Sequence, residues 1–296
     1  MEATATPAVH RPAASLRVIV SPAKRMQHGG DDTFAPQEHP NFLPATRLLA
    51  ERLCTMSFAE LRDLWKCSDT LARDAAEDLQ ALDPGRKGSL LAEDASAAQL
   101  VPAVMAYIGI QYQSMAPQVM SETGLAWIRD HLRILSGFYG VLRPFDGVAP
   151  YRLEMQARLA MPYRMSPDGD LVEEPARDLY DFWGAALSRR LGSETPDEPV
   201  RLINLASVEY ADAVLPHLDP ATMYTTCIFL EPRTVGAPVQ RATASKIARG
   251  AMVRWMAEEC IETADDLPAF DVGGYRFDPE KSREDLYVFV HDRSAE

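Results

Sequence analysis

Short apolar runs rich in β-branched residues alternate along this chain with longer segments of helical periodicity, and this alternation narrows the folds that the chain can adopt. Strands are predicted at 16–20, 132–135, 200–205, 223–230 and 286–290, with another near Tyr275. Helices are predicted within 41–82 and over 97–105, 121–131, 178–191 and 243–261. Strands that alternate with helices are typical of α/β proteins, so we expect a mixed sheet with flanking helices.

The N-terminal helical region has the clearest boundary signals. Ser57 and Glu60 stand at the spacing of a capping box, which predicts that a helix begins there, and a further helix is expected over 68–82. The sequence Asp-Pro-Gly at 83–85 then breaks the chain.

The ends of the chain indicate its organisation. Residues 1–15 are rich in Ala, Thr and Pro, which predicts a disordered tail. No repeat or linker divides the rest, so we expect one compact α/β domain over 16–296. No apolar run approaches the roughly 18 residues that a membrane span needs, and the tail contains no segment typical of a secretory signal. We therefore expect a cytoplasmic protein with no membrane partner.

Charge limits the partners that the chain attracts from a distance. Its 296 residues include 30 Lys and Arg against 43 Asp and Glu, a formal net charge of −13. A field of this sign repels phosphate, so general attraction to nucleic acid or to anionic lipid is not expected. Binding of an anion therefore requires a local basic cleft.

Cysteine and histidine positions give no metal or redox pattern. The four Cys residues lie too far apart in sequence for a CxxC pair and are too few for a disulfide scaffold, and the six His residues show no HExxH-like spacing. No metal site is predicted, and no particular cofactor is indicated. Direct peroxidase chemistry is not expected either, because no Cys falls within the polar clusters described next.

Polar side chains gather in three clusters, at points where predicted strands end. Ligand groups in open α/β sheets usually occupy such places. The first cluster, Ser21 and Lys24, directly follows the strand at 16–20. A lysine there is able to hold an anion or to activate a hydroxyl group, and a plain surface turn is the alternative.

The second cluster follows the strand at 132–135 and contains hydroxyls, guanidinium groups and a carboxylate. Its members are Ser136, Tyr139, Arg143, Tyr151, Arg152 and Glu154. Arginine binds phosphate or carboxylate through two donors, and tyrosine stacks on nucleobases. The structural alternative is that Arg152 and Glu154 form a surface ion pair, which contributes little to stability.

The third cluster combines the end of the strand at 200–205 with a later helix. Its members are Asn204, Ser207, Glu209, Tyr210, Lys246 and Arg249. Ser207 fits a helix N-cap, and Glu209 fits a first-turn carboxylate that the helix dipole favours. Lys246 and Arg249 line one side of the predicted helix with positive charge, and a solvated face is the alternative.

The use of the two cationic residue types supports a role for ammonium groups. Only five Lys occur beside 25 Arg, yet Lys24 and Lys246 both fall inside the clusters. Lysine loses its proton more readily than arginine when it is desolvated, so it serves as a base or as a compact phosphate contact.

Five strings in a fixed order resemble the YaaA family of peroxide-stress proteins. They are SPAK from Ser21, HLRxLSGxYGVLRPxDxxxPYRLEM from His131, DLYxFWG from Asp178, NLASxEY from Asn204 and KxARGxMxR from Lys246. The resemblance spans about 18–290. It implies a single α/β domain of uncommon topology, a helix-hairpin-helix element in the N-terminal helical region and a positively charged cleft. Family members are associated with DNA binding, with iron homeostasis and with the response to hydrogen peroxide.

The resemblance also implies which positions form the site. Lys24, Lys246, Glu154 and Glu209 are the hypothetical catalytic residues. The ligand-binding residues that it implies are Ser21, Tyr112, Ser136, Tyr139, Arg143, Tyr151, Arg152, Asn204, Ser207, Tyr210 and Arg249. Tyr112 is the one member of this set that lies outside the three clusters.

The chain also departs from the family pattern. Where relatives carry a KGDVY-like string, it has Ile108 and Ile110 in place of Lys and Asp, so two charges are absent from the cleft region. Thr70, Ala75 and Asp78 stand where relatives are often basic or amide. The retained polar residues therefore favour a small-ligand site over a groove that follows a phosphate backbone.

Two functions are open on this basis. In the first, a cytoplasmic protein of the oxidative stress response binds DNA or a nucleotide-like anion in a cationic cleft. In the second, an enzyme acts on a small anionic or nucleotide-like substrate, with a lysine as base or nucleophile, Arg143 and Arg152 as anion clamps and a glutamate as proton shuttle. The second requires the three clusters to share one cavity. An iron-binding role is less favoured because the sequence lacks a ligand pattern.

Overall fold

The computed structural model describes residues 15–29, 34–92, 95–193 and 199–292, so most of the tail predicted over 1–15 lies outside the described residues. Its central sheet consists of β1 (Ser15–Val20), β5 (Leu132–Ser136), β6 (Gly140–Leu142), β10 (Val200–Leu205), β11 (Met223–Leu230), β12 (Tyr275–Phe277) and β13 (Leu286–His291). The strand order is β12-β13-β11-β10-β1-β5-β6. The five middle strands are parallel, and the edge strands β6 and β12 are antiparallel to their neighbours. The predicted mixed α/β fold is confirmed.

The strands differ in how they meet the core. β1 lies between β10 and β5, and its residues from Leu16 to Val20 are all buried. A strand that is covered on both faces needs no alternation, which explains why Val18, Ile19 and Val20 are apolar in succession. β11 instead alternates between buried and partly exposed residues, so one of its faces is less covered. The buried apolar side chains form one core cluster that extends from Leu16 to Phe289.

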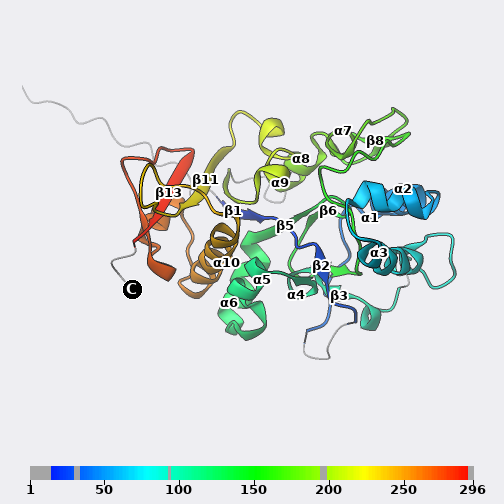
Figure 1. Cartoon of the computed structure of the whole chain (residues 1–296), viewed down its shortest axis with the longest axis horizontal. Coiled ribbons are helices and arrows are strands. Elements are labelled where there is room, and N and C mark those ends of the chain that lie inside the picture. Colours follow the sequence, from blue (N-terminus) through cyan, green and yellow to red (C-terminus); the bar gives the residue numbers. More distant parts are fainter. Residues whose placement is uncertain (1–14, 30–33, 93–94, 194–198, 293–296) are drawn as a thin grey trace, which may run out of the picture.

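The helices surround the sheet, as Figure 1 shows. They are α1 (Leu43–Cys54), α2 (Phe58–Trp65), α3 (Asp69–Leu82), α4 (Ala103–Ala106), α5 (Ile110–Met115), α6 (Glu122–His131), α7 (Leu179–Trp183), α8 (Ala186–Ser193), α9 (Val208–Ala211) and α10 (Ala242–Glu258). In Figure 1, α5, α6 and α10 lie below the sheet, α8 and α9 lie above it, and α1, α2 and α3 lie beyond β6. None of the helices in the described ranges is both long and apolar enough to cross a membrane.

Short elements fill the connections. Two-residue ladders pair β2 (Arg25–Met26) with β4 (Tyr107–Ile108), β3 (Val101–Pro102) with β7 (Gly147–Val148), and β8 (Arg164–Met165) with β9 (Leu171–Val172). The 3₁₀ helices are η1 (Ala97–Gln99), η2 (Pro117–Val119), η3 (Leu215–His217), η4 (Ala264–Ala269) and η5 (Val272–Gly274).

α10 packs directly against α5. A Cβ atom added to Gly250 would lie 2.0 Å from the carbonyl oxygen of Gln111 and 2.9 Å from Cβ of Ser114. The two helix backbones therefore touch at a point where no side chain fits. Ser114 Oγ adds a hydrogen bond of 2.7 Å to the carbonyl oxygen of Ile247. This contact fixes the positions of the residues that both helices present nearby.

The predicted helices are partly confirmed. The capping box is present, because Ser57 Oγ accepts from the N–H of Glu60 at 3.4 Å and the Ser57 N–H donates to Glu60 Oε2 at 2.8 Å. The helix predicted over 178–191 is divided into α7 and α8 at Gly184, which has a φ of +45°. The helical segment predicted over 97–105 is only partly present: η1 covers Ala97–Gln99 and α4 begins at Ala103, but Val101 and Pro102 between them are extended and pair with β7.

α2 and α3 form a helix pair in the region where the resemblance implies a helix-hairpin-helix element. Residues 66–68 join them, and Lys66 adopts a left-handed conformation with a φ of +46°. The exposed charged side chains of this pair are mainly acidic: Glu60, Asp63, Asp69, Asp74 and Glu77, against Lys66 and Arg73. A phosphate backbone is not attracted to such a surface.

Candidate functional site

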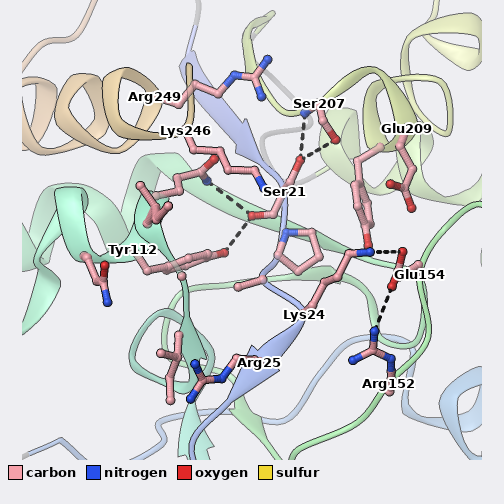
Figure 2. Close-up of a pocket in the computed structure, with 18 of the residues that line it drawn as sticks. Ser21, Lys24, Arg25, Tyr112, Arg152, Glu154, Ser207, Glu209, Lys246 and Arg249 are labelled. Carbon is pink, nitrogen blue, oxygen red and sulfur yellow. Dashed lines mark hydrogen bonds and ion pairs between the residues drawn. The ribbon is translucent and has the colours of Figure 1, made fainter. Parts of the chain in front are cut away.

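A cavity of about 470 Å³ opens where the chain leaves β1 at Ser21, and Figure 2 shows its lining. β10 runs parallel to β1, and the loop after it brings Ser207 to the same edge of the sheet. Carboxyl ends of parallel strands meet at one edge, which explains why these two distant segments are neighbours. α5, α10 and the segment at 151–154 supply the other walls.

Residues from all three sequence clusters line this cavity. They are Ser21, Lys24, Tyr151, Arg152, Glu154, Ser207, Glu209, Tyr210, Lys246 and Arg249, together with Tyr112. Four of the predicted residues do not line it: Ser136, Tyr139, Arg143 and Asn204. The sequence strings thus bring most, but not all, of their polar residues to one place.

Ser21 joins opposite walls of the cavity. Its Oγ donates to Ser207 Oγ at 3.1 Å and accepts from the backbone N–H of Ser207 at 2.8 Å. Its carbonyl oxygen accepts from the Tyr112 hydroxyl at 3.0 Å and from Gln111 Nε2 at 3.4 Å. Ser207 occupies the predicted N-cap position of α9, but its hydroxyl makes no cap hydrogen bond there and accepts from Ser21 Oγ instead.

Glu154 lies between two cations on one side of the cavity. Its Oε2 is 2.8 Å from Lys24 Nζ, and its Oε1 is 3.6 Å from Arg152 Nη2. The Lys24 side chain is mainly exposed, whereas those of Arg152 and Glu154 are mainly buried. The ion pair that offered a structural alternative for Arg152 is therefore present, but it belongs to the cavity wall.

Glu209 lies near Glu154 on the same side of the cavity (Figure 2). Its Oε1 accepts a hydrogen bond from the backbone N–H of Gln156 at 3.3 Å. Burial raises the pKa of the Glu209 carboxyl and the charge of Glu154 raises it further, while the Gln156 N–H and Lys24 act in the opposite direction. A carboxyl group with a raised pKa exchanges its proton closer to neutral pH, so Glu209 is suited to proton transfer.

Lys246 and Arg249 lie across the cavity from the two glutamates, on α10 (Figure 2). Arg249 is only 9% exposed, and it forms no ion pair with any carboxylate of the described residues. Its Nε is buried without a hydrogen-bond partner. Burial lowers the pKa of its guanidinium group, and only the Cys227 thiol opposes this shift. Lys246 is exposed, and no described carboxylate pairs with it either.

Ser136 and Tyr139 are buried behind the cavity, where they support its wall. Ser136 Oγ lies 2.7 Å from the hydroxyl oxygen of Tyr151, which lies 3.0 Å from that of Tyr107. Ser136 Oγ also accepts from two backbone N–H groups of the turn after β5. The Tyr139 hydroxyl donates to the carbonyl oxygen of Ala149 at 3.2 Å. These bonds fix the start of the segment that carries the cavity residues after Tyr151.

Gly137 lets the turn after β5 contact that segment directly. A Cβ atom at Gly137 would lie 2.8 Å from the carbonyl oxygen of Leu153 and 3.0 Å from the backbone of Glu154. The carbonyl oxygen of Gly137 accepts a hydrogen bond of 3.0 Å from Trp183 Nε1. The glycine in the family string therefore serves close backbone packing behind the cavity.

Removing the central hydroxyl of this network is expected to destabilise the protein. Tyr151→Phe leaves the hydroxyls of Ser136 and Tyr107 without their shared partner, at a cost of about 1–3 kcal/mol. Tyr107→Phe removes only the terminal hydroxyl of this hydrogen-bond network and keeps the bond between Ser136 and Tyr151. A smaller loss of stability is therefore expected. Urea unfolding of both variants measures the difference, and equal losses would contradict the central role of Tyr151.

Arg143 and Asn204 have structural partners away from the cavity. Arg143 forms ion pairs with Glu38 and with buried Asp146, and its Nη2 donates to the carbonyl oxygen of His39 at 3.0 Å. Burial raises the pKa of Asp146, although Arg143 opposes this shift. Asn204 Nδ2 donates to Thr226 Oγ1 at 3.2 Å, and its Oδ1 accepts from the backbone N–H two residues later. These two residues lie close in sequence to residues that line the cavity, but their own side chains do not reach it.

Several lining residues were not assigned from the sequence. Arg25 and Gln111 adjoin motif residues, which was the only signal available for them. Ile108 and Ile110, noted as departures, supply aliphatic lining in place of the two charges. Among the other departures, Thr70 is exposed on α3.

Asp78 has a partner of its own. Its Oδ1 lies 2.6 Å from His28 Nε2, which connects α3 to the segment after β2. The acidic residue at this position therefore has a structural use in this chain.

The described residues contain no group of three or more His, Cys, Asp or Glu side chains that are placed to hold a metal ion. Their cysteines are free thiols. Burial raises the pKa of Cys227 to about 12 and that of Cys54 to about 11, so neither thiol is activated as a thiolate.

The sequence model of a family described as "Peroxide stress protein YaaA" matches residues 16–281. A UPF0246 protein of Pediococcus pentosaceus is 42% identical over 275 residues, which cover 93% of this chain and 98% of that protein. A UPF0246 protein of Limosilactobacillus reuteri is 40% identical over 276 residues, with coverage of 93% and 98%. One of Desulfitobacterium hafniense is 37% identical over 275 residues, with the same coverage.

Proposed function

Because this chain belongs to the family of the peroxide stress protein YaaA, we propose that it takes part in the response to peroxide by binding a nucleotide-like anion in the cavity at the end of β1. The proposed setting is the cytoplasm. The bound anion lies against Lys246 and Arg249, and the rest of the ligand extends toward the opposite wall.

The environment of Arg249 carries this proposal. A buried cation without a counter-ion costs free energy in a folded protein, and proteins retain such groups mainly where a ligand neutralises them. Arg249 is buried, lines the cavity and has no acidic partner among the described residues. Lys246 lies one helical turn before it on α10, so the two cations share one side of the helix.

Size and charge favour a small ligand over duplex DNA. The cavity volume of about 470 Å³ is typical of small-molecule sites, which enclose roughly 300–1,000 Å³. The acidic surface of the α2–α3 pair and the net charge of −13 both oppose a phosphate backbone that runs along the protein.

Equilibrium titrations test this function. Nucleoside monophosphates, single-stranded DNA and duplex DNA are titrated by calorimetry or fluorescence at about 50 mM and about 200 mM salt. Lys246→Gln is expected to weaken nucleotide binding about tenfold, because it removes one charge-assisted contact. Arg254→Gln is the matched control, since Arg254 lies on the same helix and pairs with Glu258 outside the cavity.

Each outcome of these titrations has a meaning. Nucleotide binding that depends on Lys246 but not on Arg254 supports the proposal. If duplex DNA binds with a steep salt dependence and nucleotides do not bind, the ligand is nucleic acid and the small-ligand proposal is wrong. No binding of any of them at low salt would contradict an anion site.

An enzyme that acts on a small anionic substrate is the second candidate. The neighbouring carboxyls of Glu154 and Glu209, with Lys24 at 2.8 Å from the former, favour it. Two nearby carboxyl groups in different environments suit the division between a proton donor and a proton acceptor. Incubation of the protein with each nucleotide that binds, with chromatography to detect products, distinguishes an enzyme from a binding protein.

A further inference from the structure

We propose that the cavity selects nucleotide-like anions whose base carries an exocyclic amino group, and that Glu209 and Glu154 recognise this amino group while Arg249 and Lys246 hold the anion. This inference rests on the proposed function and adds the ligand's chemical class. It predicts a preference for cytosine and adenine nucleotides over uracil and hypoxanthine nucleotides.

The two sides of the cavity have opposite chemistry. On the α10 side, Arg249 and Lys246 have no acidic partner among the described residues. On the other side, two carboxyl groups stand together, and Glu154 already has Lys24 and Arg152 as neighbours. An anion placed against the glutamates would be repelled, whereas an anion on the α10 side meets unneutralised cations. The arrangement therefore orients a ligand with its anionic end toward α10.

The carboxyl side still has unused acceptor capacity. An ionised carboxylate accepts up to about four hydrogen bonds. Glu209 Oε1 accepts the backbone N–H of Gln156 at 3.3 Å, the backbone N–H of Met155 also acts on this carboxyl, and the contact of Glu154 Oε1 with Arg152 is long, at 3.6 Å. Glu154 Oε1 is buried in the cavity wall without a hydrogen-bond partner. Acceptors of this kind are satisfied by N–H donors, and carboxylates recognise the amino group of cytosine in this way.

The aliphatic part of the lining suits the body of such a ligand. Ile108 and Ile110 stand on one wall, with Tyr112 and Tyr151 nearby. These side chains supply apolar and aromatic surface against which a flat ring packs, while the charged groups contact its ends.

Two pairs of nucleotides that differ in one exocyclic group test the proposal. CMP carries an amino group where UMP carries an oxygen, and AMP and IMP differ in the same way. We expect CMP and AMP to bind about tenfold more tightly than UMP and IMP, because a carbonyl oxygen that faces a carboxylate loses a hydrogen bond and is repelled. Glu209→Gln presents an amide that also donates, so it is expected to reduce the preference to within about twofold.

Further variants separate the two ends of the ligand. Lys246→Gln is expected to weaken all four nucleotides equally and to keep the preference, because it contacts only the anion. Glu154→Gln serves as a second test of the carboxyl side if Glu209→Gln folds poorly, and circular dichroism checks folding of both. Arg254→Gln is expected to change neither affinity nor preference.

The outcomes distinguish this inference from the proposed function. Equal binding of all four nucleotides to the unmodified protein would overturn the selection for amino groups and leave an anion site in place. A preference that persists in both glutamate variants would also overturn this inference, since groups other than Glu209 and Glu154 would then recognise the base. No binding of any nucleotide would overturn the proposed function as well.

Discussion

Arg249→Met is expected to weaken nucleotide binding about a hundredfold while the ligand-free protein becomes more stable. The variant removes the buried guanidinium group that has no acidic partner among the described residues, and methionine fills a similar volume. Loss of a desolvated contact with an anion accounts for the weaker binding. Relief of an uncompensated buried charge is expected to stabilise the fold by about 1 kcal/mol or more. Calorimetric titration measures the first effect, and urea unfolding without ligand measures the second.

Arg254→Met is the control for this prediction. Arg254 is on the same helix, partly exposed and 2.6 Å from Glu258, so its loss is expected to change stability by about 0.5 kcal/mol or less and to leave binding unchanged. A clear loss of stability in Arg249→Met would show that the cation is well compensated in the free protein. Unchanged nucleotide affinity would remove Arg249 from the site.

Gly250→Ala is expected to destabilise the protein by about 3 kcal/mol or more. The added methyl group would lie 2.0 Å from the carbonyl oxygen of Gln111, a backbone atom that cannot move without shifting α5. Separation of α5 from α10 also shifts the cavity residues that these helices carry, Tyr112 and Arg249, so weaker nucleotide binding is expected in the fraction that folds. The midpoint of urea unfolding and a titration of the folded variant measure the two effects.

Gly192→Ala provides a matched control in another helix. A Cβ atom at Gly192, near the end of α8, would meet no atom within 4 Å. Alanine there is expected to be neutral or to stabilise by up to about 1 kcal/mol, because it forms helix more readily than glycine. Similar losses in both variants would show that the effect at Gly250 is one of helix propensity and not of close packing.

The sequence was sufficient for the parts of the fold that depend on local pattern. The β-branched run at 18–20 and the capping box at Ser57 and Glu60 correspond to β1 and to the start of α2 in the structure. It was insufficient where tertiary contacts override the pattern. The segment at 97–105 looks helical in isolation, but pairing with β7 makes two of its residues extended.

The candidate site shows the same division. The rule that ligand groups follow parallel strands placed Ser21 and Ser207 correctly at the edge where the cavity opens, because parallel strands share that edge. The same rule did not distinguish side chains that line the cavity from side chains that are buried behind its wall. Ser136 and Arg152 occur in one string, yet Ser136 is buried behind the wall, where its hydroxyl accepts from the backbone of the turn after β5, and Arg152 lines the cavity.

The position of Ser21 has a further consequence for how the site works. Ser21 holds α5 through its carbonyl oxygen and the start of α9 through its hydroxyl, so both walls are fixed to one residue at the end of β1. The cavity is therefore preorganised in the ligand-free protein. Recognition is therefore expected to be of the lock-and-key type, with little heat-capacity change beyond that from the contact area itself.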